Sequence, residues 1–166
     1  SQRGPGDYLG YAMVASGKTP QADAACVDAC VQRLYAITQA GGLFVDDLGL
    51  IIHEYIKSLG LTGQPRMGEK FVKWAFNNQW TQEAVRRVTL TKRADPGWRR
   101  FDEFPDQATL STFDKSDQMF VAVALASGEN PPILHATDRG WWRHKIALAA
   151  VGVSVESLCP QHAPAT

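Results

Sequence analysis

Apolar residues recur at helical spacing in three long segments of the chain. In the first segment, residues 21–40, they lie three or four positions apart, at Ala24, Val27, Val31, Leu34 and Ile37. This spacing predicts an amphipathic helix, and the Gly41-Gly42 pair predicts where that helix ends. The segments 48–59 and 68–78 show the same periodicity and predict two further helices.

Short apolar runs between and after these segments predict β-strands. They cover residues 8–14, 43–45, 88–90, 132–136 and 153–155. Three later helices are expected over residues 107–113, 117–126 and 141–150. Because strands and helices alternate along the chain, we expect an α/β fold, a three-layer sandwich with a central and mainly parallel sheet.

The distribution of these elements indicates a single domain. The chain has 166 residues, the length of one domain, and it contains no internal repeat or low-complexity tract. We expect residues 1–7 to be a flexible N-terminal end, residues 8–160 to form the domain and residues 161–166 to be a C-terminal tail. The turn-rich residues 61–105 are expected to form an irregular insertion within it.

Composition and charge exclude several classes of protein. The chain is 45% apolar, and its 17 basic and 17 acidic residues cancel to a formal charge of zero. This balance excludes a polybasic arm or an acidic disordered tail, so nucleic acid would have to be bound by a local patch. No run approaches 18 consecutive apolar residues, which predicts no membrane span and a cytoplasmic protein.

The chain has three cysteines, and we expect them to be free thiols. An odd number cannot form a complete set of disulfides and suits a reducing cytoplasm. Cys26 and Cys30 share one helix face, as the first half of a zinc site would, but we find no second Cys or His pair at metal-site spacing. Small, buried core residues are the interpretation we favour.

Three carboxylates fall where an α/β sheet usually places a ligand site. Glu54 lies at the edge of the apolar stripe of its helix, after the second expected strand. Asp117 opens the apolar helix that follows it, and Asp138 lies between a strand and the next helix. Taken singly, each is more typical of a solvated or helix-capping carboxylate.

Taken together, these carboxylates would meet at the carboxyl edge of a parallel sheet, where ligands bind. Converging carboxylates repel one another unless a cation lies between them, and Mg²⁺ or Mn²⁺ prefers oxygen ligands of this kind. Such an ion activates water and neutralises charge on a phosphodiester. The set therefore predicts metal-assisted hydrolysis of a phosphate ester.

Three motifs in this region resemble the later motifs of PIN-domain nucleases. They are LFVDDLGLIIHEYIKSLG, FDKSDQMFVAVALASG and PPILHATDRGWW, and the resemblance spans residues 8–159 in order. It implies a PIN-like α/β sandwich and a Mg²⁺- or Mn²⁺-dependent nuclease that acts usually on RNA. It also implies that Glu54, Asp117 and Asp138 are the catalytic, metal-binding positions, with Asp114 as a possible helper. Members of the family often act as toxins of toxin–antitoxin pairs or in defence, and many form homodimers.

The first motif of that family, a strand carrying Asp, is altered here. Counting back from Ala15 puts Tyr8 and Gly10 at the motif positions. Asp7 lies one residue away, and one step along a strand reverses the direction of a side chain. We include Asp7 as a fourth candidate metal ligand. Loss of this ligand would weaken metal binding, and the alternative interpretation is a catalytically impaired module that binds nucleic acid or a partner protein.

Two other classes of enzyme fit the sequence less well. The segment Val14–Thr19 is similar to a phosphate-binding loop, but Ala12 stands where that loop needs glycine. A serine hydrolase is disfavoured because the chain has no G-x-S-x-G elbow and its four histidines follow no triad pattern.

Five basic residues are candidates for contact with a nucleic-acid backbone: Lys18, Arg99, Arg100, Arg139 and Arg143. The run that includes Trp98 and Phe101 has the composition of a surface that binds a single strand by charge and stacking. It is slightly more typical of a loop whose aromatic side chains pack on the domain.

Overall fold

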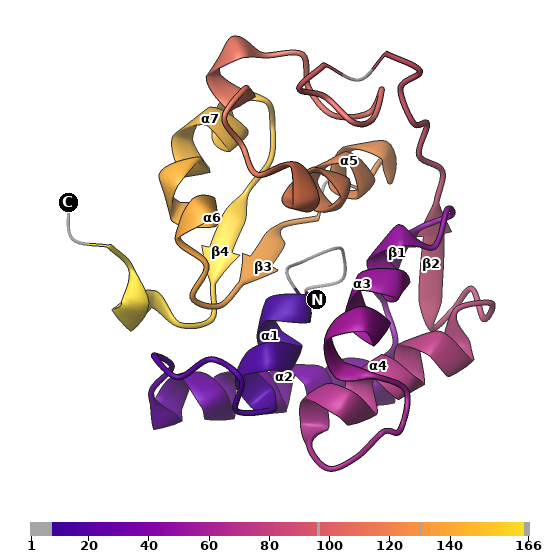
Figure 1. The fold of residues 1–166 in the computed structure, drawn as a ribbon, viewed down its shortest axis with the longest axis vertical. Coiled ribbons are helices and arrows are strands. Elements are labelled where there is room, and N and C mark those ends of the chain that lie inside the picture. The colour runs from indigo at the N-terminus through magenta and orange to yellow at the C-terminus, as the bar shows by residue number, and fades with distance from the viewer. Residues whose placement is uncertain (1–7, 96, 130, 165–166) are drawn as a thin grey trace.

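The computed structural model describes residues 8–95, 97–129 and 131–164, and within them helices outweigh strands (Figure 1). The helices of its first half are α1 (Tyr8–Ala15), α2 (Ala24–Ala40), α3 (Leu50–Leu59) and α4 (Met67–Asn78). Those of the second half are α5 (Gln118–Ala126), α6 (Arg139–Arg143) and α7 (Lys145–Ala150). The strands are β1 (Leu43–Asp46), β2 (Val85–Val88), β3 (Ile133–His135) and β4 (Val155–Ser157), and the short 3₁₀ helices are η1 (Ala108–Leu110), η2 (Lys115–Asp117) and η3 (Pro160–His162).

The first four helices pack together, and an aromatic cluster joins α1, α3 and α4. α1 lies against α2 and α4, and α4 also contacts α2 and α3. The ring of Tyr8 stacks on Phe71 with 5.8 Å between centroids, and Tyr55 meets the same Phe71 ring edge-on at 5.3 Å. These rings are almost fully buried, so they fix α1, α3 and α4 against one another.

The four strands form two parallel pairs. β1 pairs with β2 in the register Leu43 to Val85, and β3 pairs with β4 in the register Ile133 to Val155. Every residue of β1 and β3 is buried, as expected for strands that are covered on both faces. The parallel pairing predicted from the alternation of strands and helices is therefore confirmed.

α5 connects the two strand pairs. It contacts both β1 and β3, while α1 contacts β3 from the helical half of the chain. All residues of α5 from Gln118 to Ala124 are buried, which explains why its sequence is apolar on every face. The buried side chains of both halves form one continuous hydrophobic core.

The three long helices are confirmed at the places their periodicity predicted. α2 begins at Ala24 after Asp23, whose side chain accepts a hydrogen bond from the Cys26 N–H at 2.8 Å. It ends at Gly41, which adopts a φ of 73° and donates its N–H to the carbonyl of Ile37. Asp46 at the end of β1 stabilises the start of α3, because its two carboxylate oxygens accept the N–H groups of Leu50 and Ile51 at 2.9 Å.

Four predicted elements differ from the structure in type or in position. Residues 8–14 form a helix rather than a strand, so Val14–Thr19 does not follow a strand as a phosphate-binding loop would. The helix expected over residues 141–150 is two short helices that meet at His144. The strands expected over 88–90 and 153–155 lie at Val85–Val88 and Val155–Ser157 instead.

The expectation of three free thiols is also wrong. Cys26 in α2 and Cys159 after β4 form a disulfide, with their Cα atoms 5.2 Å apart and 133 positions between them in sequence. Cys30 is buried and stands outside this bond. The bond ties the first long helix to the end of the described chain, a pairing that sequence spacing alone does not reveal.

None of the helices in the described ranges combines the length and the apolar character needed to cross a membrane.

Candidate functional site

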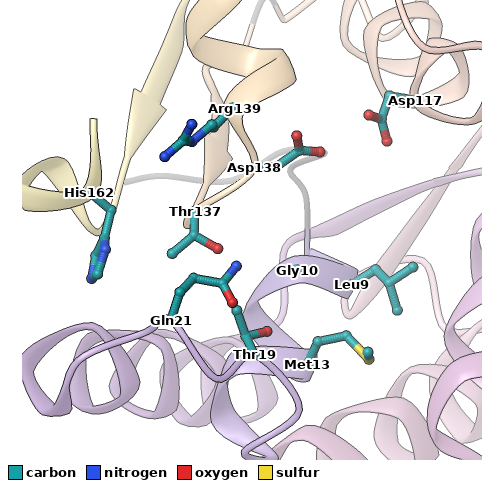
Figure 2. A pocket seen from close by; sticks show the side chains of 10 residues that line it. All are labelled: Leu9, Gly10, Met13, Thr19, Gln21, Asp117, Thr137, Asp138, Arg139 and His162. Carbon is teal, nitrogen blue, oxygen red and sulfur yellow. The ribbon is translucent and has the colours of Figure 1, made fainter. Parts of the chain in front are cut away.

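A pocket of about 700 Å³ opens between α1, the start of α5 and the start of α6. Its walls come from five parts of the chain: Leu9, Gly10, Met13, Thr19, Gln21, Asp117, Thr137, Asp138, Arg139 and His162. Figure 2 shows the carboxylates of Asp117 and Asp138 turned toward the same open space. The structure thus brings together two of the three catalytic residues that the sequence predicted.

Asp117 reaches this pocket because a 3₁₀ turn leads into α5. η2 is capped by Asp114, whose carboxylate accepts the N–H of Ser116 at 2.9 Å and its hydroxyl at 2.8 Å. Asp117 then stands directly before α5, half-buried, and its side chain makes no capping bond to that helix. Asp114, the expected helper, is exposed and is not among the residues that line the pocket.

Asp138 reaches the pocket from the opposite wall, where β3 leads into α6. Its Oδ1 accepts the N–H of Gly140 at 2.8 Å, so this residue caps α6. The capping role suggested by the sequence is therefore present, and it uses one of the two carboxylate oxygens. The side chain is exposed to solvent and shares its loop with Thr137, another pocket residue.

Glu54 lies in a separate hollow beside the pocket. It is half-buried on α3 and lines a cavity of about 60 Å³ together with Arg100, Ser116 and other residues. Ser116 is the residue before Asp117, so this hollow adjoins the η2 segment. In the part of the chain that the structure describes, however, Glu54, Asp117 and Asp138 do not form a group with all ligand atoms within 4.8 Å.

The first motif does not take the form that its sequence suggested. Tyr8 and Gly10, which the sequence predicted to lie in the strand of this motif, belong to α1. The Tyr8 ring is buried among aromatic side chains, and this burial raises the pKa of its hydroxyl to about 12. Gly10 lies at the pocket wall, and Asp7, the fourth candidate ligand, lies outside the described residues. The register that related Asp7 to Tyr8 therefore does not apply, because that register presumed a strand.

The five basic candidates for nucleic-acid contact lie in different surroundings. Arg139 lines the pocket, and Lys18 and Arg143 are exposed elsewhere. Arg99 points into its own loop instead, where it donates to the carbonyls of Asp102 and Phe104. Arg100 donates to the carbonyl of Lys115 at 3.3 Å and lines the hollow that contains Glu54.

The aromatic loop that contains Trp98 packs on the domain, as the sequence slightly favoured. Phe101 and Phe104 are fully buried, and Trp98 meets Phe104 edge-on with 6.1 Å between ring centroids. Gln118, at the start of α5, is also fully buried and accepts the Arg100 N–H while donating to the Trp98 carbonyl. These two bonds hold the loop against the helix that follows Asp117.

Sequence reasoning missed the pocket residues from the α1–α2 connection and from the C-terminal end. Thr19, Gln21 and His162 are single polar residues in turn-rich segments, and the sequence did not assign any of them to this pocket. His162 reaches this region because it faces the capping residue of α2, with its Nε2 3.5 Å from the nearer oxygen of Asp23.

Comparisons with models of protein families, with curated proteins and with solved structures found no match.

Proposed function

We propose that the protein is a divalent-metal-dependent nuclease that hydrolyses phosphodiester bonds, with RNA as its substrate. The observation that supports this most is the placement of Asp117 and Asp138, which enter one pocket from two different segments. Arg139 adds a positive charge to the same pocket. Two carboxylates and a guanidinium suit a phosphate ester. The carboxylates can hold a divalent cation, and the positively charged guanidinium attracts the negatively charged phosphate.

The residues present fit a magnesium or manganese ion. Mg²⁺ keeps several of its waters and is usually bound by one or two carboxylates together with substrate phosphates. Asp117 and Asp138 would hold it, and the pocket has room for its waters. Once bound, the ion supplies an activated water and neutralises charge on the phosphate. Glu54 is not needed for this minimal set and would contact a water or the substrate from the adjoining hollow.

The chain's own residues then position the substrate. The guanidinium of Arg139 would bind a non-bridging phosphate oxygen, since a planar fork of N–H donors matches that group. The hydroxyl of Thr137 and the amide of Gln21 line the same pocket and offer hydrogen bonds to a ribose or a base. Hydrogen bonds from these groups to a ribose 2′-hydroxyl would select RNA over DNA.

The PIN-like architecture belongs to this proposal. β1 and β3 each keep one edge that no strand of the described chain pairs, and α5 contacts both strands. In this proposal the two pairs belong to the central layer of a three-layer sandwich. A toxin or defence role, with a partner protein or a homodimer, is the biological setting that the PIN resemblance suggests.

Cleavage of RNA by the purified chain tests the proposal. We expect cleavage of a single-stranded RNA with Mg²⁺ or Mn²⁺ and none with a chelator. Asp117→Asn should lower the rate by at least about 100-fold, because the ion contributes several kcal/mol to the transition state. Asp28→Asn, which changes an exposed carboxylate of α2, is the matched control and should cleave like the wild type.

Two results would count against the proposal. One is cleavage that Asp117→Asn leaves unchanged while circular dichroism shows a folded protein. The other is RNA binding without divalent metal and without cleavage, which would favour the non-catalytic binding module instead.

A further inference from the structure

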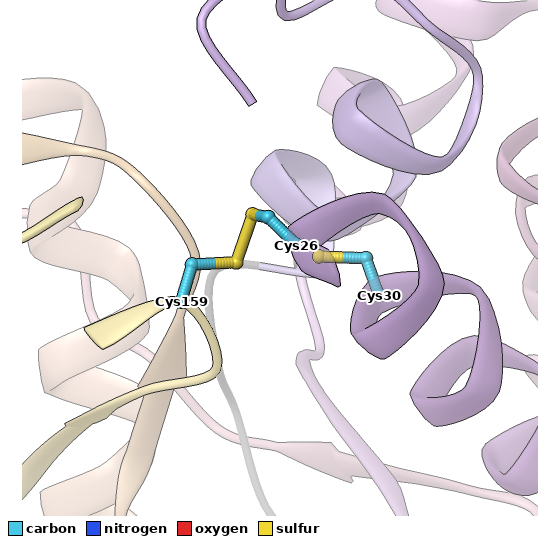
Figure 3. A group of neighbouring side chains, drawn as sticks. All are labelled: Cys26, Cys30 and Cys159. Atoms are coloured by element: carbon cyan, nitrogen blue, oxygen red, sulfur yellow. A yellow bond between two sulfur atoms is a disulfide. The ribbon is translucent and has the colours of Figure 1, made fainter. Parts of the chain in front are cut away.

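Three cysteine sulfur atoms lie together where α2 meets the end of β4. Cys26 and Cys30 are one turn apart on α2, and Cys159 follows β4 (Figure 3). Each is 0% exposed, and the three sulfur atoms all lie within 4.8 Å of one another. Cys26 and Cys159 form the disulfide, with the Cys30 thiol directly beside it. The disulfide alone does not require this third sulfur.

Reduction of the disulfide would leave three thiols close enough together to form a metal–thiolate site. A zinc ion binds thiolate sulfur at about 2.3 Å, which in a tetrahedral site puts two sulfur atoms about 3.8 Å apart. Once the disulfide is reduced, its two sulfur atoms need to separate by only a side-chain rotation to reach such a distance. Cys30 already lies within 4.8 Å of both, so no movement of α2 is required.

We propose that the reduced protein binds one Zn²⁺ ion through Cys26, Cys30 and Cys159. Thiolate ligands select zinc, whereas Mg²⁺ and Mn²⁺ prefer the oxygen ligands offered by Asp117 and Asp138. The three thiolate ligands are therefore chemically distinct from the carboxylates proposed for catalysis, and the inference does not depend on the nuclease assignment.

His162 is the fourth ligand in this proposal. It follows Cys159 with two residues between them, and this Cys-x₂-His spacing is the second metal-site pair that sequence inspection overlooked. Its Nε2 faces the Asp23 carboxylate at 3.5 Å. A histidine ligand usually donates one ring N–H to a carboxylate and binds the metal through the other nitrogen. His162 lies outside the 4.8 Å group, so η3 has to move toward the sulfur atoms when the metal binds.

Metal binding and disulfide formation exclude each other, because both use the sulfur atoms of Cys26 and Cys159. A dithiol reductant breaks the S–S bond, supplying two electrons and two protons, and becomes a disulfide itself. Zinc then replaces the protons of the three thiols, releasing three protons to solvent. The site therefore binds metal under reducing conditions and releases it when the disulfide forms again.

Titration of the full chain with Zn²⁺ and with Co²⁺ tests this inference. The protein reduced with a dithiol, and then freed of it, should bind one Zn²⁺ per chain, and Co²⁺ should give thiolate charge-transfer absorption. The oxidised protein should bind neither ion at this site. Asp117→Asn, which alters the proposed nuclease site, should bind zinc like the wild type.

Cys30→Ser is the decisive variant, because it leaves the Cys26–Cys159 disulfide in place. It should fold and oxidise normally, yet its reduced form should bind zinc at least about 100-fold more weakly, since a direct ligand is lost. His162→Ala should weaken binding and leave the cobalt–thiolate absorption in place. Equal zinc affinity in reduced wild type and Cys30→Ser would overturn the inference. So would a reduced wild type that takes up no zinc, or one that is unfolded and stays unfolded when zinc is added.

Discussion

At the scale of single residues, His135 shows how burial fixes a charge state. Its side chain is 1% exposed and meets the ring of Trp142 edge-on, with 4.7 Å between centroids. Burial, and secondarily the charge of Lys145, lowers the pKa of its imidazole from 6.5 to about 4. The residue is therefore neutral at neutral pH, which suits a structural role in the core.

This shift predicts how acid acts on the fold. Below pH 6.5 the unfolded chain binds a proton at His135 that the folded chain does not bind until about pH 4. Stability from this residue is therefore complete above pH 6.5 and is lost as the pH falls toward 4, by roughly 3 kcal/mol. When unfolding in urea is measured at pH 7 and at pH 4, the free energy of unfolding should decrease less between these pH values in His135→Phe than in the wild type.

His53→Gln provides the control for that measurement. His53 is exposed on α3. Its replacement should therefore leave the decrease in the free energy of unfolding between pH 7 and pH 4 the same as in the wild type. The burial account fails if His135→Phe loses as much stability in acid as the wild type does.

The sequence predicted some site residues well and others not at all. Asp117 and Asp138 could be placed because each opens a helix after a loop, which is a local pattern. Whether a side chain such as Glu54 turns into the same pocket depends on how α3 packs on η2 and α5, and local patterns do not contain that information. Thr19 and His162 could not be assigned to this pocket from the sequence, because their segments become neighbours only through the tertiary fold.

At the scale of elements, the contact between α1 and α4 depends on a glycine. A Cβ at Gly68 would overlap the carbonyl oxygen of Ala12 and the hydroxyl of Ser16, so α1 could not lie as close to α4. α1 also carries Leu9, Gly10 and Met13, which line the pocket. The approach of these two helices therefore helps to shape the candidate site.

Gly68→Ala should lower the free energy of unfolding, by about 1–3 kcal/mol, as measured in urea. The direction of this change is informative, because replacing glycine by alanine in an unhindered helix stabilises the helix by up to about 1 kcal/mol. Lys70→Ala on the exposed side of the same helix should change stability by less than about 0.5 kcal/mol. A more stable Gly68→Ala variant would show that α1 does not lie against α4 in this way.

The helices that were predicted correctly are the amphipathic ones. α2, α3 and α4 each have one buried face, so a period of three to four residues appears in the sequence. Residues 8–14 are apolar throughout because α1 is packed on several sides, and such a run does not distinguish a buried helix from a buried strand. At the break between α6 and α7, the ring of His144 packs on Phe113 and contacts Thr112, which are tertiary contacts that the local sequence does not indicate.

At the scale of the whole molecule, the disulfide closes a loop of most of the chain. Cys26 and Cys159 are separated by 133 positions, and the chain-entropy model assigns about 5 kcal/mol to closing a loop of this size. Reduction in the presence of a zinc chelator should therefore lower the free energy of unfolding by about 2–5 kcal/mol. Cys30→Ser should show the same dependence on reduction, because it retains the bond. Equal stability of the oxidised and reduced protein would show that this link does not form in solution.

The central claim for the molecule is that Asp117 and Asp138 together hold a divalent cation. Calorimetric titration of Mn²⁺ into the oxidised full chain tests it most directly, since the Cys26–Cys159 disulfide then occupies two of the three clustered sulfur atoms. The wild type and Asp28→Asn should bind Mn²⁺, and more tightly than Mg²⁺, because manganese stands above magnesium in affinity for mixed ligand sets. The double variant Asp117→Asn/Asp138→Asn should show no binding while circular dichroism reports an intact fold. Mn²⁺ binding by the double variant with wild-type affinity would contradict the claim.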